Sequence, residues 1–199
     1  MSALTSLCVY CGSSIGDRAE YSHAAEALGT LLASRKIRLV YGGGNVGLMG
    51  VIATAALRAG GEVVGVIPRA LMEKELGLRS CTELLVVESM HERKKLMADR
   101  SDAFVAMAGG IGTLEELFET FTWQQLRFHD KPLGLLNTLG FYDGLLEFLE
   151  HTTASRFLAR HHKDALQVDA DPAALLDKLA AWQPNADSKW ATRLDAEAR

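Results

Sequence analysis

Residues 103–116 read AFVAMAGGIGTLEE, so a short apolar run passes through a glycine-rich loop into a segment of helix-forming residues. Glycines let backbone N–H groups approach an anion closely, and the positive end of the following helix dipole points toward the same place. The pattern therefore predicts a phosphate-binding loop after a buried strand. Glu116, expected in the first turn of that helix, would partly cancel the attraction for phosphate. Its carboxylate indicates a second chemical role.

The alternation of apolar strand, loop and helix recurs on both sides of this segment. Strands are predicted at residues 7–10, 37–41, 63–67, 84–87, 103–107 and 133–136, and helices at about 20–34, 48–59, 142–151 and 172–182 and from about 89 onward. This order predicts an α/β fold, a doubly wound Rossmann-like parallel sheet with helices on both faces. Ligands of such sheets bind beyond the carboxyl ends of the strands, where the strand order reverses. We therefore expect the loops after Tyr10, Tyr41 and Met107 to converge on one crevice.

The chain has 199 residues, 48% of them hydrophobic, which is long enough for one well-buried core. We expect a single α/β domain over residues 1–183 and a polar C-terminal tail over residues 184–199. The net charge of −4 gives no broad basic surface, so no nucleic-acid partner is expected. Residues 1–20 lack a signal-peptide pattern, and no apolar run approaches the roughly 18 residues that span a bilayer. These features predict a cytoplasmic protein without a membrane partner.

Two short motifs have alternative explanations. Cys8 and Cys11 have CxxC spacing, but there is no second pair and no nearby histidine, so strand core is favoured over a metal or redox site. Residues 42–47 match the GxGxxG dinucleotide pattern in a strand-to-helix context. The acid that would bind the ribose could only be Glu62, which precedes the strand at 63–67 instead of ending it. We therefore expect neither a metal nor a cofactor.

Glu116 has both a structural and a functional interpretation. Thr113 and Glu116 have the spacing of a capping box, which would make the glutamate a helix-start residue. Counting at 100° per residue, however, places Glu116 opposite the helix face formed by Leu114, Leu117, Phe118 and Phe121. It would then face away from the core, beside the expected phosphate. This favours a functional carboxylate, which could also cap the helix.

Arg93 and Lys94 lie early in the helix that begins near Ser89, where Ser89 and Glu92 also fit a capping box. Such a pair of cations is usually a solvated surface feature. At the start of a helix, however, positive charge opposes the helix dipole. A nearby anion or carboxylate therefore explains the pair better.

The chain also carries several longer motifs in a fixed order. They are VYCGSS at 9–14, VYGGG at 40–44, GLMG at 47–50, GVIP at 65–68, MHERK at 90–94, the loop at 109–116, TWQQL at 122–126 and HDKP at 129–132. Together they resemble the Lonely Guy (LOG) family of cytokinin riboside 5′-monophosphate phosphoribohydrolases, often labelled possible lysine decarboxylases, over residues 5–180. Ala108 stands where the family usually has the proline of its PGGxGTxxE motif. Its loss should loosen the loop slightly without removing an N–H donor.

The resemblance implies a homodimer and hydrolysis of the N-glycosidic bond of N6-substituted AMP to free base and ribose 5-phosphate, in a nucleotide-binding catalytic domain. Glu116 would stabilise the cationic ribose and orient water, and Arg93, which is always protonated, would be its orienting partner. The implied substrate contacts are Ser14, Gly43, Gly44, Glu75, Met90, Arg93, Lys94, Gly109, Gly110, Ile111, Gly112, Thr113, Leu114, Glu115, Glu116 and Thr122. No lysine is placed as a Schiff base for pyridoxal phosphate, so the decarboxylase label has little physical support.

Two other functions remain open at this stage. One is a broader AMP or purine nucleotide nucleosidase, and the other is a non-catalytic binding protein that resembles nucleotide or molybdenum-cofactor carriers. Retention of Arg93 and Glu116 favours an enzyme. For the homodimer, we expect contacts through Trp123, Leu126 and Phe128, because large apolar groups near a polar site are explained by partner burial. Ordinary core packing is the alternative for these three side chains.

Overall fold

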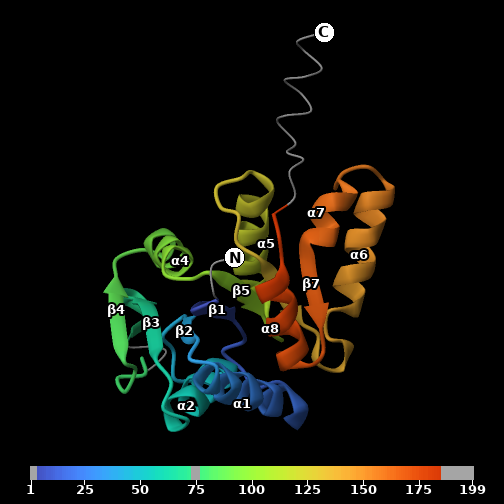
Figure 1. Cartoon of the computed structure of the whole chain (residues 1–199). Coiled ribbons are helices and arrows are strands. Elements are labelled where there is room, and N and C mark those ends of the chain that lie inside the picture. Colours follow the sequence, from blue (N-terminus) through green and yellow to red (C-terminus); the bar gives the residue numbers. More distant parts are fainter. Residues whose placement is uncertain (1–3, 73–76, 185–199) are drawn as a thin grey trace.

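The structure is a computed structural model that describes residues 4–72 and 77–184. Seven strands form one sheet in the order β4-β3-β2-β1-β5-β6-β7, and all neighbouring pairs are parallel (Figure 1). The strands are β1 (Ser6–Tyr10), β2 (Arg38–Tyr41), β3 (Val63–Pro68), β4 (Glu83–Val87), β5 (Ala103–Ala106), β6 (Leu133–Leu136) and β7 (Leu166–Asp169). The chain winds from β1 to one edge and returns through β5 to the other. This confirms the doubly wound, Rossmann-like fold.

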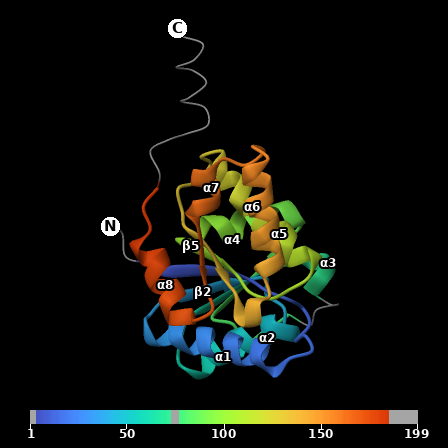
Figure 2. The same cartoon turned by 90° about the vertical axis from the view of Figure 1, so that its right-hand side faces the viewer.

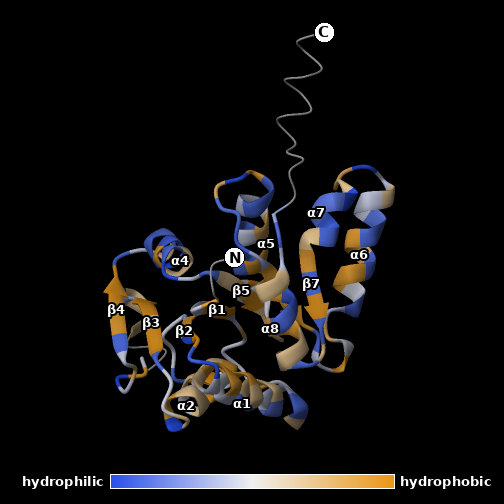
Figure 3. Cartoon of the chain, viewed as in Figure 1, coloured by the Kyte–Doolittle hydropathy of each residue, from blue (hydrophilic) through white to orange (hydrophobic). Residues whose placement is uncertain are grey.

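Helices cover both faces of the sheet (Figures 1 and 2). They are α1 (Ala19–Ser34), α2 (Gly47–Arg58), α3 (Arg69–Met72), α4 (Met90–Asp99), α5 (Ile111–Gln125), α6 (Asp143–Ala154), α7 (Arg160–Ala165) and α8 (Pro172–Ala181), with a 3-10 turn, η1 (Thr138–Gly140). Helices α1, α2 and α8 pack on one face, whereas α4, α5 and α6 pack on the other. Mainly hydrophobic strands therefore lie between two layers of helices, which carry both hydrophobic and hydrophilic residues (Figure 3).

Successive residues of β1 alternate between the two cores. Leu7 and Val9 pack with α1, α2 and α8, whereas Cys8 and Tyr10 pack with α4, α5 and α6. Cys11, just after the strand, belongs to the first of these cores, so the two cysteines contribute to opposite faces. Burial raises the pKa of both thiols, which keeps them protonated. The interpretation of the CxxC spacing as strand core is confirmed.

Every predicted strand and helix is present, with bounds that differ by a few residues at most. The cap at Ser89 is confirmed, because its Oγ accepts the Glu92 N–H at 3.1 Å, while Glu92 Oε2 accepts the Glu88 N–H. Asp171 Oδ1 likewise accepts the Ala174 N–H and caps α8. The short elements α3, η1, α7 and β7 were not predicted. Helix α7 runs directly into β7 without a turn, so no local signal separates the two.

The predicted tail at residues 184–199 lies, apart from Pro184, outside the described residues, so the division of the chain at residue 183 stays a prediction. Within the two described ranges, none of the helices combines the length and apolar character needed to cross a bilayer.

Candidate active site

A cavity of about 250 Å³ opens where the strand order reverses, at the carboxyl ends of β1 and β5. The loops after β1, β2 and β5 meet there, together with α2 and the starts of α4 and α5. Its lining consists of Val9, Tyr10, Cys11, Gly12, Ser13, Gly42, Met49, Met90, Arg93, Gly110, Ile111, Gly112, Thr113, Glu115 and Glu116. The three loops thus converge on one crevice, as the parallel topology requires.

The glycines of the loop after β5 differ in their surroundings. A Cβ on Gly109 would clash with the Thr113 hydroxyl and lie 2.9 Å from Gly12 N, so glycine is required there for packing. A Cβ on Gly110 or Gly112 would meet no atom within 4 Å and would instead occupy the crevice. The first hydrogen bond of α5 runs from Leu114 N–H to Gly110 O, so the amides of residues 111–113 precede the helical ladder. Together these features form an open cradle for an anion.

The capping-box interpretation of Glu116 is wrong. Gly110 is the N-cap of α5, so Thr113 is already the third helical residue. The glycine loop enters the helix three residues earlier than that pattern assumes. Glu116 is only 9% exposed, and Arg93 of α4 lies beside it on the side of α5 that periodicity left facing solvent, whereas Phe118, placed on the core face by the same count, is exposed.

Arg93 brings a buried positive charge to the same cavity. The residue is 6% exposed, and its Nη2 lies 3.7 Å from Glu116 Oε1 and donates to Gly42 O at 3.3 Å. A Cβ on Gly42 would overlap this guanidinium, so the glycine makes room for it. Arg93 Nε is buried and has no hydrogen-bond partner among the described residues. A carboxylate and a guanidinium therefore lie side by side, away from bulk water, next to the anion cradle.

Lys94 lies behind this pair and connects two helices. Its Nζ contacts Glu115 Oε1 and lies 2.9 Å from Glu119 Oε2, both on α5. Burial opposes the charge on Lys94, but the two carboxylates outweigh that effect and raise the pKa of the ammonium group. A lysine that forms a Schiff base needs the opposite shift. Lys94 does not line the cavity, and its charge holds α4 against α5.

The other predicted contact residues take several places. Ser14 and Gly109 line an adjoining cavity of about 320 Å³ that shares Gly12, Ser13 and Gly110 with the crevice. Gly43 is buried, and its carbonyl accepts the Leu78 N–H. Gly44 is buried beside it. Leu114 is half-buried against the core, and Thr122 is exposed on α5, where its hydroxyl donates to Phe118 O. Glu75 lies outside the described residues.

Sequence reasoning placed the crevice but missed part of its wall. Tyr10, Gly12, Ser13, Gly42 and Met49 line it and were not among the predicted contacts. Their positions at or just after the ends of β1 and β2, or in the first turn of α2, were the available signal. In a parallel sheet, the carboxyl ends of the strands lie at the same side, so residues at those ends lie beside the same crevice.

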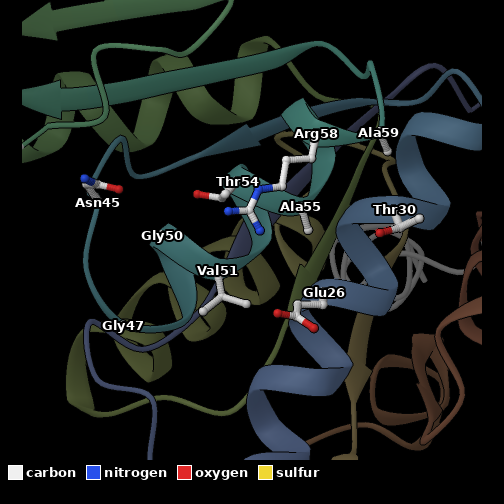
Figure 4. A pocket seen from close by; sticks show the side chains of 10 residues that line it. All are labelled: Glu26, Thr30, Asn45, Gly47, Gly50, Val51, Thr54, Ala55, Arg58 and Ala59. Atoms are coloured by element: carbon white, nitrogen blue, oxygen red, sulfur yellow. The ribbon is translucent and has the colours of Figure 1, made fainter.

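Two other locations lack the features of this site. Glu62 lies at the amino end of β3 and pairs with Arg38, whereas the crevice lies at the carboxyl ends of the strands. Residues 42–47 therefore lack the acidic partner that a dinucleotide-binding site needs. A larger groove of about 640 Å³ runs between α1 and α2, with Glu26 and Thr30 facing the side chains of α2 (Figure 4). Its charged side chains, Glu26 and Arg58, are exposed, so it offers no buried reactive group.

The fold and site define a Rossmann-like α/β protein with an anion cradle and a buried carboxylate–guanidinium pair at its switch point. A family model described as "Possible lysine decarboxylase" matches residues 49–179. The probable cytokinin riboside 5′-monophosphate phosphoribohydrolase LOGL9 of Oryza sativa subsp. japonica is 49% identical over 178 residues, which cover 89% of this chain and 78% of that protein. Cytokinin riboside 5′-monophosphate phosphoribohydrolase LOG1 of Arabidopsis thaliana is 46% identical, with 89% and 84% covered. The chain belongs to this LOG family.

Solved structures with the same fold include carriers of the molybdenum cofactor. The carrier protein from Chlamydomonas reinhardtii superposes with a TM-score of 0.67 at 22% identity and covers 90% of this chain and 99% of its own. The molybdenum cofactor binding protein from Rippkaea orientalis gives a TM-score of 0.65 at 20% identity, with 89% and 96% covered. At these identities, the likeness concerns the fold alone.

Proposed function

We propose that this protein hydrolyses the N-glycosidic bond of cytokinin riboside 5′-monophosphates, which are N6-substituted forms of AMP, and releases the free base and ribose 5-phosphate. The observation that carries the proposal is the buried Arg93–Glu116 pair next to the open cradle at the start of α5. The names of the relatives at 46% and 49% identity support the same reaction. The cavity of about 250 Å³ suits a sugar phosphate.

The reaction needs a negative charge beside the ribose. As the bond between ribose C1′ and the base breaks, the base leaves with the electron pair and the sugar becomes positively charged. Water then adds its oxygen to C1′ and gives up one proton, and the departing base takes up one proton, so the products are the neutral base and ribose 5-phosphate. The Glu116 carboxylate stabilises the cationic sugar and orients the water from a buried position, where electrostatic effects are strong.

Arg93 has an orienting role in this scheme. A guanidinium stays protonated throughout, so it does not act as a general acid. Its Nη2 is fixed by Gly42 O and lies 3.7 Å from Glu116, which holds the carboxylate in one orientation. The amides before the helical ladder of α5 bind the 5′-phosphate, and Lys94 acts from behind by holding α4 against α5.

Incubation of the purified protein with AMP and with N6-isopentenyl-AMP, followed by chromatography of the products, tests this function. We expect equal amounts of free base and ribose 5-phosphate, formed faster from N6-isopentenyl-AMP. Equal rates for the two nucleotides would point to a broader purine nucleotide nucleosidase. A nucleotide that stays bound and intact would contradict hydrolysis and favour a carrier.

We further propose that the enzyme is a homodimer that uses the end of α5. Phe128, which follows this helix, is 72% exposed, and Trp123 and Leu126 are half-buried. A large exposed aromatic side chain is explained by burial against a partner. Trp123 is already half-buried in the single chain because it packs against the core beneath α5.

A further inference from the structure

The hydroxyl group of Tyr142 contacts the backbone that leads into the glycine loop. It lies outside the crevice, directly before α6, and donates to Met107 O at 2.6 Å. Both residues are only 1% exposed, so this bond forms away from water. Met107 is the first residue after β5 and lies two residues before Gly109. The bond therefore acts at the root of the loop that we propose to bind phosphate.

Two backbone hydrogen bonds at this root come from the side of β1. Met107 N–H donates to Tyr10 O at 2.9 Å, and Gly12 N–H donates to Ala108 O at 3.0 Å, so both bonds tie the loop to β1 and the residues that follow it. The Tyr142 hydroxyl reaches the loop from the direction of α6 instead. It holds the Met107 carbonyl, which neither of these two bonds uses.

Tyr142 is itself held in place. Its N–H donates to Asn137 Oδ1 at 2.7 Å, and Asn137 Nδ2 donates to Asp143 Oδ1 at 2.7 Å. Asn137 follows β6 directly, so a chain of hydrogen bonds runs from the end of β6 through Tyr142 to the end of β5. The hydroxyl group thus links the end of β6 to the start of the glycine loop.

The sequence of the loop makes such a restraint consequential. Gly109 and Gly110 have the widest backbone freedom of any residue type, and Ala108 lacks the ring that would fix φ in a proline. We propose that the Tyr142 hydroxyl is a positioning group, which keeps the amides at the start of α5 aligned for the substrate phosphate. The inference rests on the proposed function.

The test compares Tyr142→Phe with Tyr41→Phe. Tyr41 is also fully buried, and its hydroxyl contacts Cys81 Sγ instead of the loop, so it controls for the loss of a buried hydroxyl group. For each variant and the wild type, kcat/KM is measured with N6-isopentenyl-AMP and with its unphosphorylated riboside, alongside thermal melting. We expect Tyr142→Phe to lower the ratio of kcat/KM for N6-isopentenyl-AMP to kcat/KM for the riboside about tenfold or more, since misplaced binding groups carry such costs. Tyr41→Phe should leave the ratio unchanged.

The possible outcomes separate the two levels of the proposal. If the wild type shows no preference for the phosphorylated substrate, the proposed function fails. If the wild type shows that preference and Tyr142→Phe retains it, or loses activity equally on both substrates, the positioning role is overturned. Should Tyr142→Phe not accumulate, Ala108→Gly loosens the same backbone without removing a side-chain hydrogen bond. A lowered ratio in this variant supports the role of loop position, and an unchanged ratio overturns it.

Discussion

Alanine substitutions at Gly112 and Gly144 distinguish an effect on helix stability from an effect on substrate binding. Each is the second residue of its helix, and a Cβ on either would meet no atom within 4 Å. Replacement by alanine should stabilise the protein by up to about 1 kcal/mol in both cases, because alanine forms helices more readily. Only Gly112 lies in the crevice, so only Gly112→Ala should raise KM for N6-isopentenyl-AMP.

Thermal melting and steady-state kinetics of the two variants check this prediction. A normal KM in Gly112→Ala, together with the expected rise in melting temperature, would mean that the start of α5 does not contact the substrate. Equal effects of both variants on KM would assign the change to helix stability.

The roles of single residues were predictable only where one element determines them. The glycine loop was visible because strand, loop and helix are consecutive in residues 103–116. The burial of Glu116 and the separate partners of Arg93 and Lys94 were not visible, because they depend on how α4 packs beside α5. Sequence periodicity predicts which face of one helix meets the core. It does not predict contacts between that helix and a second helix beside it.

At the level of elements, Asp102 joins the amino ends of β5 and β1, on the side of the sheet opposite the crevice. Its Oδ2 accepts hydrogen bonds from the N–H and hydroxyl groups of Thr5 and Ser6, at 2.7 to 2.9 Å. Partial burial opposes ionisation, but these four bonds outweigh it and lower the pKa of Asp102. The resulting stabilisation is therefore complete above the unfolded-state pKa of about 3.9 and is lost as the pH falls through the folded-state value.

Asp102→Asn should lower the free energy of unfolding by about 1 kcal/mol at pH 7, and the difference from wild type should shrink as the pH falls below about 3.9. Urea denaturation at pH 7, 5 and 3.5 measures it. Asp130→Asn is the control, because Asp130 is exposed and pairs with Arg127 three residues away, a contact of little expected value. A loss of stability that is the same at all three pH values would contradict the assignment.

The elements themselves followed from the sequence where apolar runs are bounded by glycine or proline. The strand that ends at Pro68 and the helix that begins at Pro172 have such boundaries. Strand β7 has none, and Leu166–Asp169 become a strand by pairing with β6. That contact joins segments about thirty residues apart, so no local pattern reports it.

For the whole molecule, the proposed dimer can be tested at Phe128. Phe128→Asp should convert a dimer to a monomer in light scattering at micromolar concentration, because a charge would be buried in the interface. Leu139→Asp is the control, since Leu139 is 54% exposed in η1, which follows β6, whereas Phe128 precedes that strand. A monomeric wild type, or a Phe128→Asp variant that stays dimeric, would contradict this interface.

The overall architecture was the most predictable level. Two cores on opposite faces follow from parallel strands that alternate with helices, and the crevice follows from the reversal of strand order between β1 and β5. The chemistry of the crevice depends on side chains from α4 and α5 that meet only after folding. Membership of the LOG family then connects this geometry to a reaction.

The turnover of Glu116→Gln tests the central claim, that a buried carboxylate beside a phosphate cradle hydrolyses the nucleotide. Glutamine keeps the size and much of the hydrogen-bonding capacity of the side chain but removes its charge, so the melting temperature should change little. Loss of a positioned acid–base group typically lowers the rate by about 10² to 10⁴. We predict a fall in kcat of this size for N6-isopentenyl-AMP. A Glu116→Gln variant that folds normally and keeps a near-normal kcat would contradict the account.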